Sequence, residues 1–165
     1  METLPEKFLL VLIRNGISIY KVEKEKKLER VSGSIIGEKT ILAILKLKFP
    51  NKNLDSMIND AFYKGDNRNL DLLVSDIYGA NTKNLGLPAE LIASSLGRLG
   101  KMKTEEVGEL SEVDICRSVL IAFAINVALL TSIYMKNEKL EAGIVLGDKL
   151  HNPYFYLAIQ VYLCL

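Results

Sequence analysis

The residues best suited to chemistry in this sequence are glycines and hydroxyl and cationic side chains between positions 30 and 40. Gly33, Lys39 and Thr40 have the spacing of a P-loop, in which backbone amides cradle phosphates. That motif needs a glycine just before the lysine, where this chain has Glu38. The segment before Gly33 also has the pattern of a hairpin strand rather than the first strand of a βαβ unit. We therefore reject the P-loop interpretation.

Arg30 is the strongest candidate for binding an anion. A guanidinium can hold a carboxylate or a phosphate through two parallel hydrogen bonds. The alternative is a surface arginine on a strand, paired with its neighbour Glu29. Residue type alone favours the surface pair.

A metal site has little support in the sequence. Asp66, Asp71 and Asp76 recur every five residues, a spacing that spreads side chains around a helix instead of along one face. We predict solvated carboxylates at these positions. The single histidine and the two cysteines lack the spacing of a metal cluster: His151, Cys116 and Cys164.

Length and composition describe an ordinary globular chain. The 165 residues suffice for one domain with a core, which we predict over residues 5–163. Hydrophobic residues make up 49% of the chain and charged residues 25%, as in soluble proteins. The net charge is +1, from 21 Lys and Arg against 20 Asp and Glu. Charge therefore gives no reason to expect nucleic acid or an anionic membrane as a partner.

Targeting and membrane signals are weak. The apolar run 9–13 is short and follows Glu2 and Glu6, unlike a signal peptide, so a cytoplasmic location is expected. Residues 118–135 carry no charge and reach the lower length limit of a membrane span. We favour a core helix there, because such a helix is also apolar all round. Asn126 within it is expected to form a buried or cross-dimer hydrogen bond.

The chain is predicted to begin with three antiparallel strands. Residues 8–13 form a continuous apolar run, and residues 17–22 alternate apolar and polar positions. Asn15-Gly16 is expected to turn between them, because both residues tolerate positive φ. The third strand returns over residues 28–32.

Helices dominate the remainder. The long helix is expected from Ser111, with Asp114 as its capping partner. Residues 91–96 are ambiguous between strand and helix, and residues 101–109 are polar and exposed. The other predicted elements are helices 40–48, 54–63 (capped by Asn53) and 69–77, a loop 78–88, the long helix to 135, a strand 141–146 and a helix 153–163.

Several stretches stand in an order and spacing that resemble the eukaryotic-type (type II) pantothenate kinases. The resemblance covers roughly residues 5–160. Arg14-Asn15-Gly16 stands where that family has a Gly-Ser-Gly turn, and residues 29–40 stand where it has Arg-Val-Gly/Thr-Gly-Thr/Ser and a glycine triplet ending in threonine. The most specific stretches follow in order: Gly65-Asp66, 73–79, Gly86-Leu87-Pro88, Ala93-Ser94-Ser95, Asn137-Glu138-Lys139 and Gly147.

The resemblance implies an α/β actin-like ATPase (ribonuclease H-like) domain, present in part as the C-terminal half. It also implies ATP- and Mg²⁺-dependent phosphorylation of pantothenate, the opening step of coenzyme A synthesis, with inhibition by acyl-coenzyme A in a homodimer. The family's first phosphate loop, of Asp-x-Gly-Gly-Thr type, and its catalytic carboxylate are expected upstream of these residues. Because residues 161–165 are apolar, the end of the chain is expected to be unfinished.

The resemblance assigns roles to individual residues. Ser18 and Arg30 fall at positions that contact pantothenate or acyl-coenzyme A, and Ala93 borders the same pocket. The nucleotide-facing positions of the second glycine-rich loop fall on three residues: Gly33, Gly37 and Thr40.

Departures from the family pattern leave the activity of this chain open. Arg14 and Asn15 replace turn residues, and Glu38 and Lys39 replace glycines whose lack of a Cβ lets backbone amides approach phosphates. We expect the chain alone to be inactive. One alternative is a non-catalytic dimerisation or regulatory module that binds a full-length pantothenate kinase. The other is a gene fragment.

Overall fold

The computed structural model describes residues 5–24, 28–79, 82, 84 and 86–148. The chain divides into two compact units, one of residues 1–52 and 123–165 and one of residues 53–122. We call them the sheet unit and the middle unit. Helix α5, Glu112–Asn137, runs through both.

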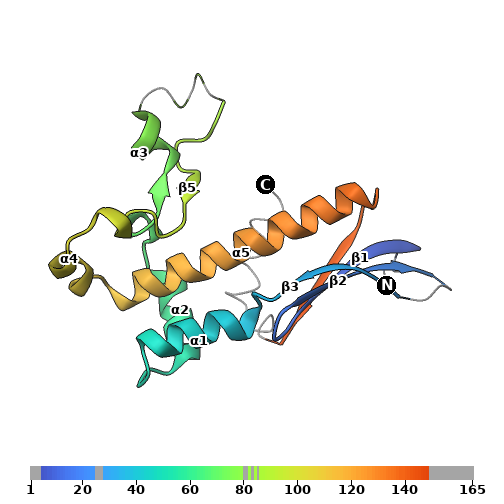
Figure 1. Cartoon of the computed structure of the whole chain (residues 1–165), viewed down its shortest axis with the longest axis horizontal. Helices are drawn as coiled ribbons and strands as arrows, with labels where there is room; N and C mark the ends of the chain where they lie inside the picture. The colour runs from blue at the N-terminus through green and yellow to red at the C-terminus, as the bar shows by residue number, and fades with distance from the viewer. Residues whose placement is uncertain (1–4, 25–27, 80–81, 83, 85, 149–165) are drawn as a thin grey trace. The chain divides into compact units, whose positions relative to one another are not determined.

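A four-stranded mixed sheet with the strand order β3-β2-β1-β6 forms the sheet unit (Figure 1). Strands β1 (Lys7–Ile13), β2 (Ile17–Glu23) and β3 (Glu29–Ser34) are antiparallel neighbours. Strand β6 (Gly143–Gly147) lies parallel to β1. The α/β class and the three opening strands are confirmed.

The two faces of this sheet differ because side chains alternate along each strand. Leu9, Val11 and Ile13 of β1 are fully buried, and so is Ile19 of β2. These side chains form the core face of the sheet. Their burial explains the apolar character of the first strand. The opposite face, which we call the outer face, carries pairs such as Leu12 with Ser18 in neighbouring strands and is less buried.

Helix α1 (Glu38–Lys48) follows β3 and buries Ile41 and Leu45. Phe49 caps its carboxyl end directly before Pro50, in agreement with the predicted end of the helix at residue 48. The Thr40 hydroxyl accepts a hydrogen bond from the Gly37 amide at 3.4 Å and so closes the amino end of the helix.

Helix α5 confirms the long helix of the sequence. Val127 and Thr131 are buried, and a methyl group of Thr131 comes within 3.7 Å of where a Cβ on Gly143 of β6 would lie. The helix is long and apolar enough to cross a membrane, but half of its most apolar stretch is buried inside the protein. This burial supports the core-helix interpretation.

Two details of the prediction for α5 change. Asn126 is exposed, so the expected buried hydrogen bond is wrong, while the cross-dimer alternative stays a prediction. Asp114 does not serve as a cap partner of Ser111, because its two oxygens accept from the Asp66 amide at 2.6 Å and the Asn69 side chain at 2.7 Å. Its charge instead orders the loop that follows α2.

The middle unit begins with α2 (Leu54–Lys64), whose Asn53 cap is confirmed by a 3.1 Å bond from the Ser56 amide. Three short elements of the unit make close local contacts: β4 (Leu72–Leu73), α3 (Val74–Tyr78) and β5 (Ile92–Ser94). Strands β4 and β5 pair antiparallel, so residues 91–96 contain a strand. Helix α4 (Thr104–Gly108) covers most of the polar stretch 101–109.

The predicted helix 69–77 is wrong, and so is the solvated carboxylate at Asp71. Asp71 is fully buried, and its carboxylate accepts from the Leu96 amide and from the Asn67 side chain, both at 2.8 Å. These bonds hold the chain extended at β4. The apolar residues whose spacing predicted one helix instead belong to three elements, a 3₁₀ turn (Asn67–Asn69) with the residues after it, strand β4 and the short helix α3. The predicted helix 153–163 lies outside the described residues.

Candidate ligand pocket on the outer face of the sheet

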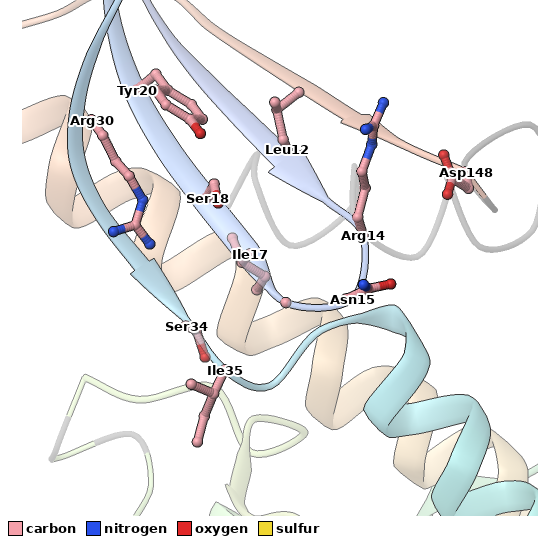
Figure 2. Close-up of a pocket in the computed structure, with 11 residues that line it drawn as sticks. Leu12, Arg14, Asn15, Ile17, Ser18, Tyr20, Arg30, Ser34, Ile35 and Asp148 are labelled. Atoms are coloured by element: carbon pink, nitrogen blue, oxygen red, sulfur yellow. The ribbon is translucent and has the colours of Figure 1, made fainter.

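A hollow of about 810 Å³ opens on the outer face of the sheet, around the β1–β2 turn (Figure 2). Strands β1, β2 and β3 and the end of β6 contribute to it. The lining residues that carry polar groups are Arg14, Asn15, Ser18, Tyr20, Arg30, Ser34 and Asp148.

Strand register explains why these polar groups meet. Tyr20 lies opposite Arg30, and Ser18 lies opposite Leu12, so all four project from the same face of the sheet. Because β1 and β6 are parallel with Ile13 opposite Gly147, the residues just after these strands also become neighbours. This juxtaposition brings Arg14 and Asp148 to the pocket.

Arg30 is exposed and forms no ion pair with Glu29 or with any other described residue. The surface-pair alternative is therefore not realised. A Cβ at Gly33 would lie 2.6 Å from the Arg30 guanidinium and 2.5 Å from the Ile17 carbonyl oxygen. Gly33 thus gives the guanidinium room to lie over the strand and reach into the pocket.

The other two glycines near the pocket are contact points between backbones. A Cβ at Gly16 would lie 2.5 Å from the Ser34 carbonyl oxygen, and one at Gly37 would lie 2.5 Å from both the Asn15 oxygen and the Gly16 Cα. The β1–β2 turn exists as predicted, but neither Asn15 nor Gly16 adopts a positive φ. The reason for a glycine here is close packing against β3 and α1.

The amino end of α1 does not fit a phosphate cradle. The Ile36 amide donates to Ser34 Oγ at 3.1 Å, and the Gly37 amide donates to Thr40 Oγ1. Glu38, which follows, is buried with 6% of its surface exposed. The Ile36 and Gly37 amides therefore already have partners, and the nucleotide role of Gly33, Gly37 and Thr40 stays a prediction.

Among the described residues no three Asp, Glu, His or Cys side chains gather as a metal site. The hydrogen bond from Arg68 lowers the pKa of Asp66, and the Leu73 amide, helped by Arg98, lowers the pKa of Asp76. These carboxylates are committed to partners in the protein. The described part of the chain thus supplies no ready donor set for Mg²⁺.

The described thiol is also unsuited to chemistry. Burial raises the pKa of Cys116 to about 12, so the thiol stays protonated and a poor nucleophile at neutral pH.

Three residues are expected at a pantothenate or acyl-coenzyme A site. Ser18 and Arg30, both in the sheet unit, line the pocket. Ala93 is exposed on β5 of the middle unit, and its place at the border of the pocket stays a prediction. Sequence reasoning missed Tyr20 and Asp148. The strand pattern could have placed Tyr20 beside Arg30, but no local signal pairs Asp148 with the β1–β2 turn.

Comparison with known proteins identifies the family. The Fumble family profile matches residues 2–152. A pantothenate kinase of Schizosaccharomyces pombe is 33% identical over 135 residues, which are 81% of this chain and 33% of that protein. Pantothenate kinase 2 of Arabidopsis thaliana is 37% identical over 121 residues, 73% of this chain and 13% of the relative.

A protein with a different printed activity also matches. The 4'-phosphopantetheine phosphatase of Mus musculus is 36% identical over 134 residues, 81% of this chain and 16% of that protein. This chain therefore spans a third or less of the relatives named here. By the extent of the family match and the identity to its kinases, the chain belongs to the Fumble, or pantothenate kinase, family.

Proposed function

We propose that this chain serves the ATP-dependent phosphorylation of pantothenate, which opens coenzyme A synthesis, by supplying the surface that holds the acid. The observation that carries the proposal is the pocket that joins Arg30 and Ser18. Arg30 has no ion-pair partner among the described residues, and the carboxylate of pantothenate is an anion that a guanidinium binds well. Ser18 and Tyr20 add hydroxyl groups beside it. Acyl-coenzyme A would compete for the same surface.

The proposed fold is part of an actin-like ATPase (ribonuclease H-like) domain. The mixed sheet supports this assignment, because three antiparallel strands are followed by a long helix and a strand parallel to β1. A cytoplasmic location is proposed with it.

Phosphoryl transfer requires positioned phosphates, metal charge and a group that orients the attacking hydroxyl. The sequence contains no Asp-x-Gly-Gly-Thr stretch, and the amides before α1 have partners within the chain. We therefore assign the phosphate loop and the catalytic carboxylate to residues beyond these 165, on the same polypeptide or a partner. Mg²⁺, where it binds with ATP, would neutralise charge on the transferred phosphate.

A second candidate is a non-catalytic module that pairs with a complete pantothenate kinase. The engaged amides of Ile36 and Gly37, just before α1, favour it, and so does an exposed apolar pair on α5. Leu129 and Ile133 are 55% and 51% exposed, and their i, i+4 spacing places them on one face. A homodimer, or a dimer with a complete paralogue, would cover this pair.

A chimera tests the proposal. This chain replaces the matching segment of the Schizosaccharomyces pombe kinase, and phosphorylation of labelled pantothenate is measured with ATP and Mg²⁺. We expect turnover by the chimera, none by the isolated chain, and a KM for pantothenate raised at least about tenfold by Arg30→Ala with circular dichroism unchanged. A folded, ATP-binding chimera that lacks turnover, or a KM unaffected by Arg30→Ala, would overturn it. Altered activity of a complete kinase on mixing with the chain would support the second candidate.

A further inference from the structure

The pocket contains two guanidinium groups that come from different elements. Arg14 lies in the β1–β2 turn and Arg30 on β3, and both line the hollow (Figure 2). Among the described residues, neither side chain has an ion pair or a hydrogen bond. Asp148 is the one carboxylate among the described lining residues, so these residues together carry a net positive charge.

The two arginines are attached to the sheet at separate places. The Arg30 guanidinium lies over Gly33, whose neighbours across the sheet are Ser18 and then Leu12. Arg14 follows Leu12 by two positions, so two strand spacings and two residues of rise place the Arg14 Cα roughly 12 Å from Gly33. Each guanidinium can therefore bind its own anion, with Ser18 on the strand between them.

We propose that Arg14 makes this pocket selective for a ligand with an anionic group at each end, and that it favours phosphorylated pantothenate over pantothenate. This inference rests on the proposed function. Pantothenate carries its carboxylate at one end and the hydroxyl that receives the phosphate at the other. With the carboxylate at Arg30, the phosphate ester lies toward Arg14.

Arg14 suits a phosphate better than it suits a hydroxyl. A phosphate monoester carries about −1.5 to −2 charges at neutral pH and three strong acceptors, which match the fork of a guanidinium. A free hydroxyl at the same place gains little from the cation. A pocket of this kind retains the phosphorylated product, which suits a binding or regulatory chain.

Asp148 limits this preference. It follows β6 as Arg14 follows β1, and Figure 2 shows both side chains on the same side of the pocket. Its negative charge opposes a phosphate near Arg14. Replacing it by the neutral Asn is therefore expected to strengthen binding of the phosphate ester and to leave pantothenate nearly unaffected.

Calorimetric titration of the full 165-residue chain tests the inference with four probes. Pantothenate has only the carboxylate, 4'-phosphopantetheine has only the phosphate, phosphopantothenate has both, and inorganic phosphate is the simple anion. We expect phosphopantothenate to bind about tenfold tighter than pantothenate or 4'-phosphopantetheine, each of which has one anionic group. Arg14→Ala should reduce the affinity for phosphopantothenate to that for pantothenate. Arg30→Ala should weaken the binding of both acids. Arg68→Ala is the matched control, because it removes the same charge from the middle unit, where Arg68 pairs with Asp66.

The outcomes separate the two proposals. Pantothenate binding that depends on Arg30, without preference for the phosphate ester or without an effect of Arg14→Ala, overturns this inference and leaves the proposed function standing. A chain folded by circular dichroism that binds neither acid overturns both. Equal affinity for phosphopantothenate and inorganic phosphate would show a simple phosphate site and would also contradict the inference.

Discussion

At the scale of single residues, buried or paired carboxylates determine the conformation of the middle unit. Asp71 joins residues 67 and 96, which are far apart in sequence, through its two oxygens. Asp114 likewise uses its two oxygens to join α5 to residues 66 and 69. Residue type and spacing suggested a solvated carboxylate for Asp71 and a helix-capping role for Asp114, because the sequence does not show which backbone amides need a partner. Each of these carboxylates satisfies a backbone donor.

Asp71→Ala should destabilise the chain by about 1–3 kcal/mol, because it leaves the Leu96 amide and the Asn67 side chain without their acceptor. Chemical denaturation measures the effect. Asp60→Ala is the control, since Asp60 forms only an exposed i, i+4 pair with Lys64 and should change the stability by less than about 0.5 kcal/mol. Equal losses in the two variants would contradict the structural role of Asp71.

Asp76 should make stability depend on pH in the acidic range. Its pKa in the folded chain is lowered from 3.8, first by the Leu73 amide and then by Arg98. A lowered folded pKa adds stability above the unfolded pKa, and this contribution is lost as the pH falls through the folded value. The melting-temperature difference between wild type and Asp76→Ala should thus be full at about pH 7 and shrink as the pH falls below the unfolded value of 3.8. A difference that grows on acidification would contradict this assignment.

At the scale of elements, local pattern predicts most of the strands and helices. The opening strands, the helix capped by Asn53 and the long helix follow from apolar spacing, caps and Pro50. The pattern fails between residues 69 and 77, where a long-range bond to Asp71 overrides helical spacing. Local pattern also could not predict that Asp148 lines the pocket, because the β1–β6 pairing joins segments over a hundred residues apart.

The end of α5 offers a test of backbone strain. Lys139 has φ of 53°, in the left-handed region, where the Leu140 amide donates back to Met135 O at 2.9 Å. Lys139→Gly should therefore stabilise the chain by roughly 0.5–1 kcal/mol. Lys136→Gly, in the last helical turn, is the matched control and should destabilise it by about 1 kcal/mol. Shifts of the denaturation midpoint in opposite directions for the two variants would support the left-handed conformation of Lys139. Destabilisation by Lys139→Gly would refute it.

At the scale of the whole molecule, exposed apolar side chains support the proposal that the chain pairs with a partner. Leu129 and Ile133 of α5 are apolar, yet each is more than half exposed. An exposed apolar stripe of this kind marks an interaction surface or promotes aggregation.

We expect the isolated chain to elute from size exclusion as a dimer or larger species. The double variant Leu129→Lys, Ile133→Lys should shift it toward the monomer, because the charged side chains resist burial in an interface. The control is Lys46→Glu, Lys48→Glu, a double change of exposed residues on α1. Wild-type elution as a compact 18.4 kDa monomer with cooperative unfolding would contradict the prediction.

The proposed function depends on pantothenate binding to Arg30 on the outer face of the sheet. Its most direct test is calorimetric titration of pantothenate into the folded chain and into the Arg30→Ala variant. We predict saturable binding at one site per chain, weakened at least about tenfold by the substitution, with circular dichroism unchanged. Absence of binding to the wild-type chain, or equal binding to both proteins, would contradict the claim.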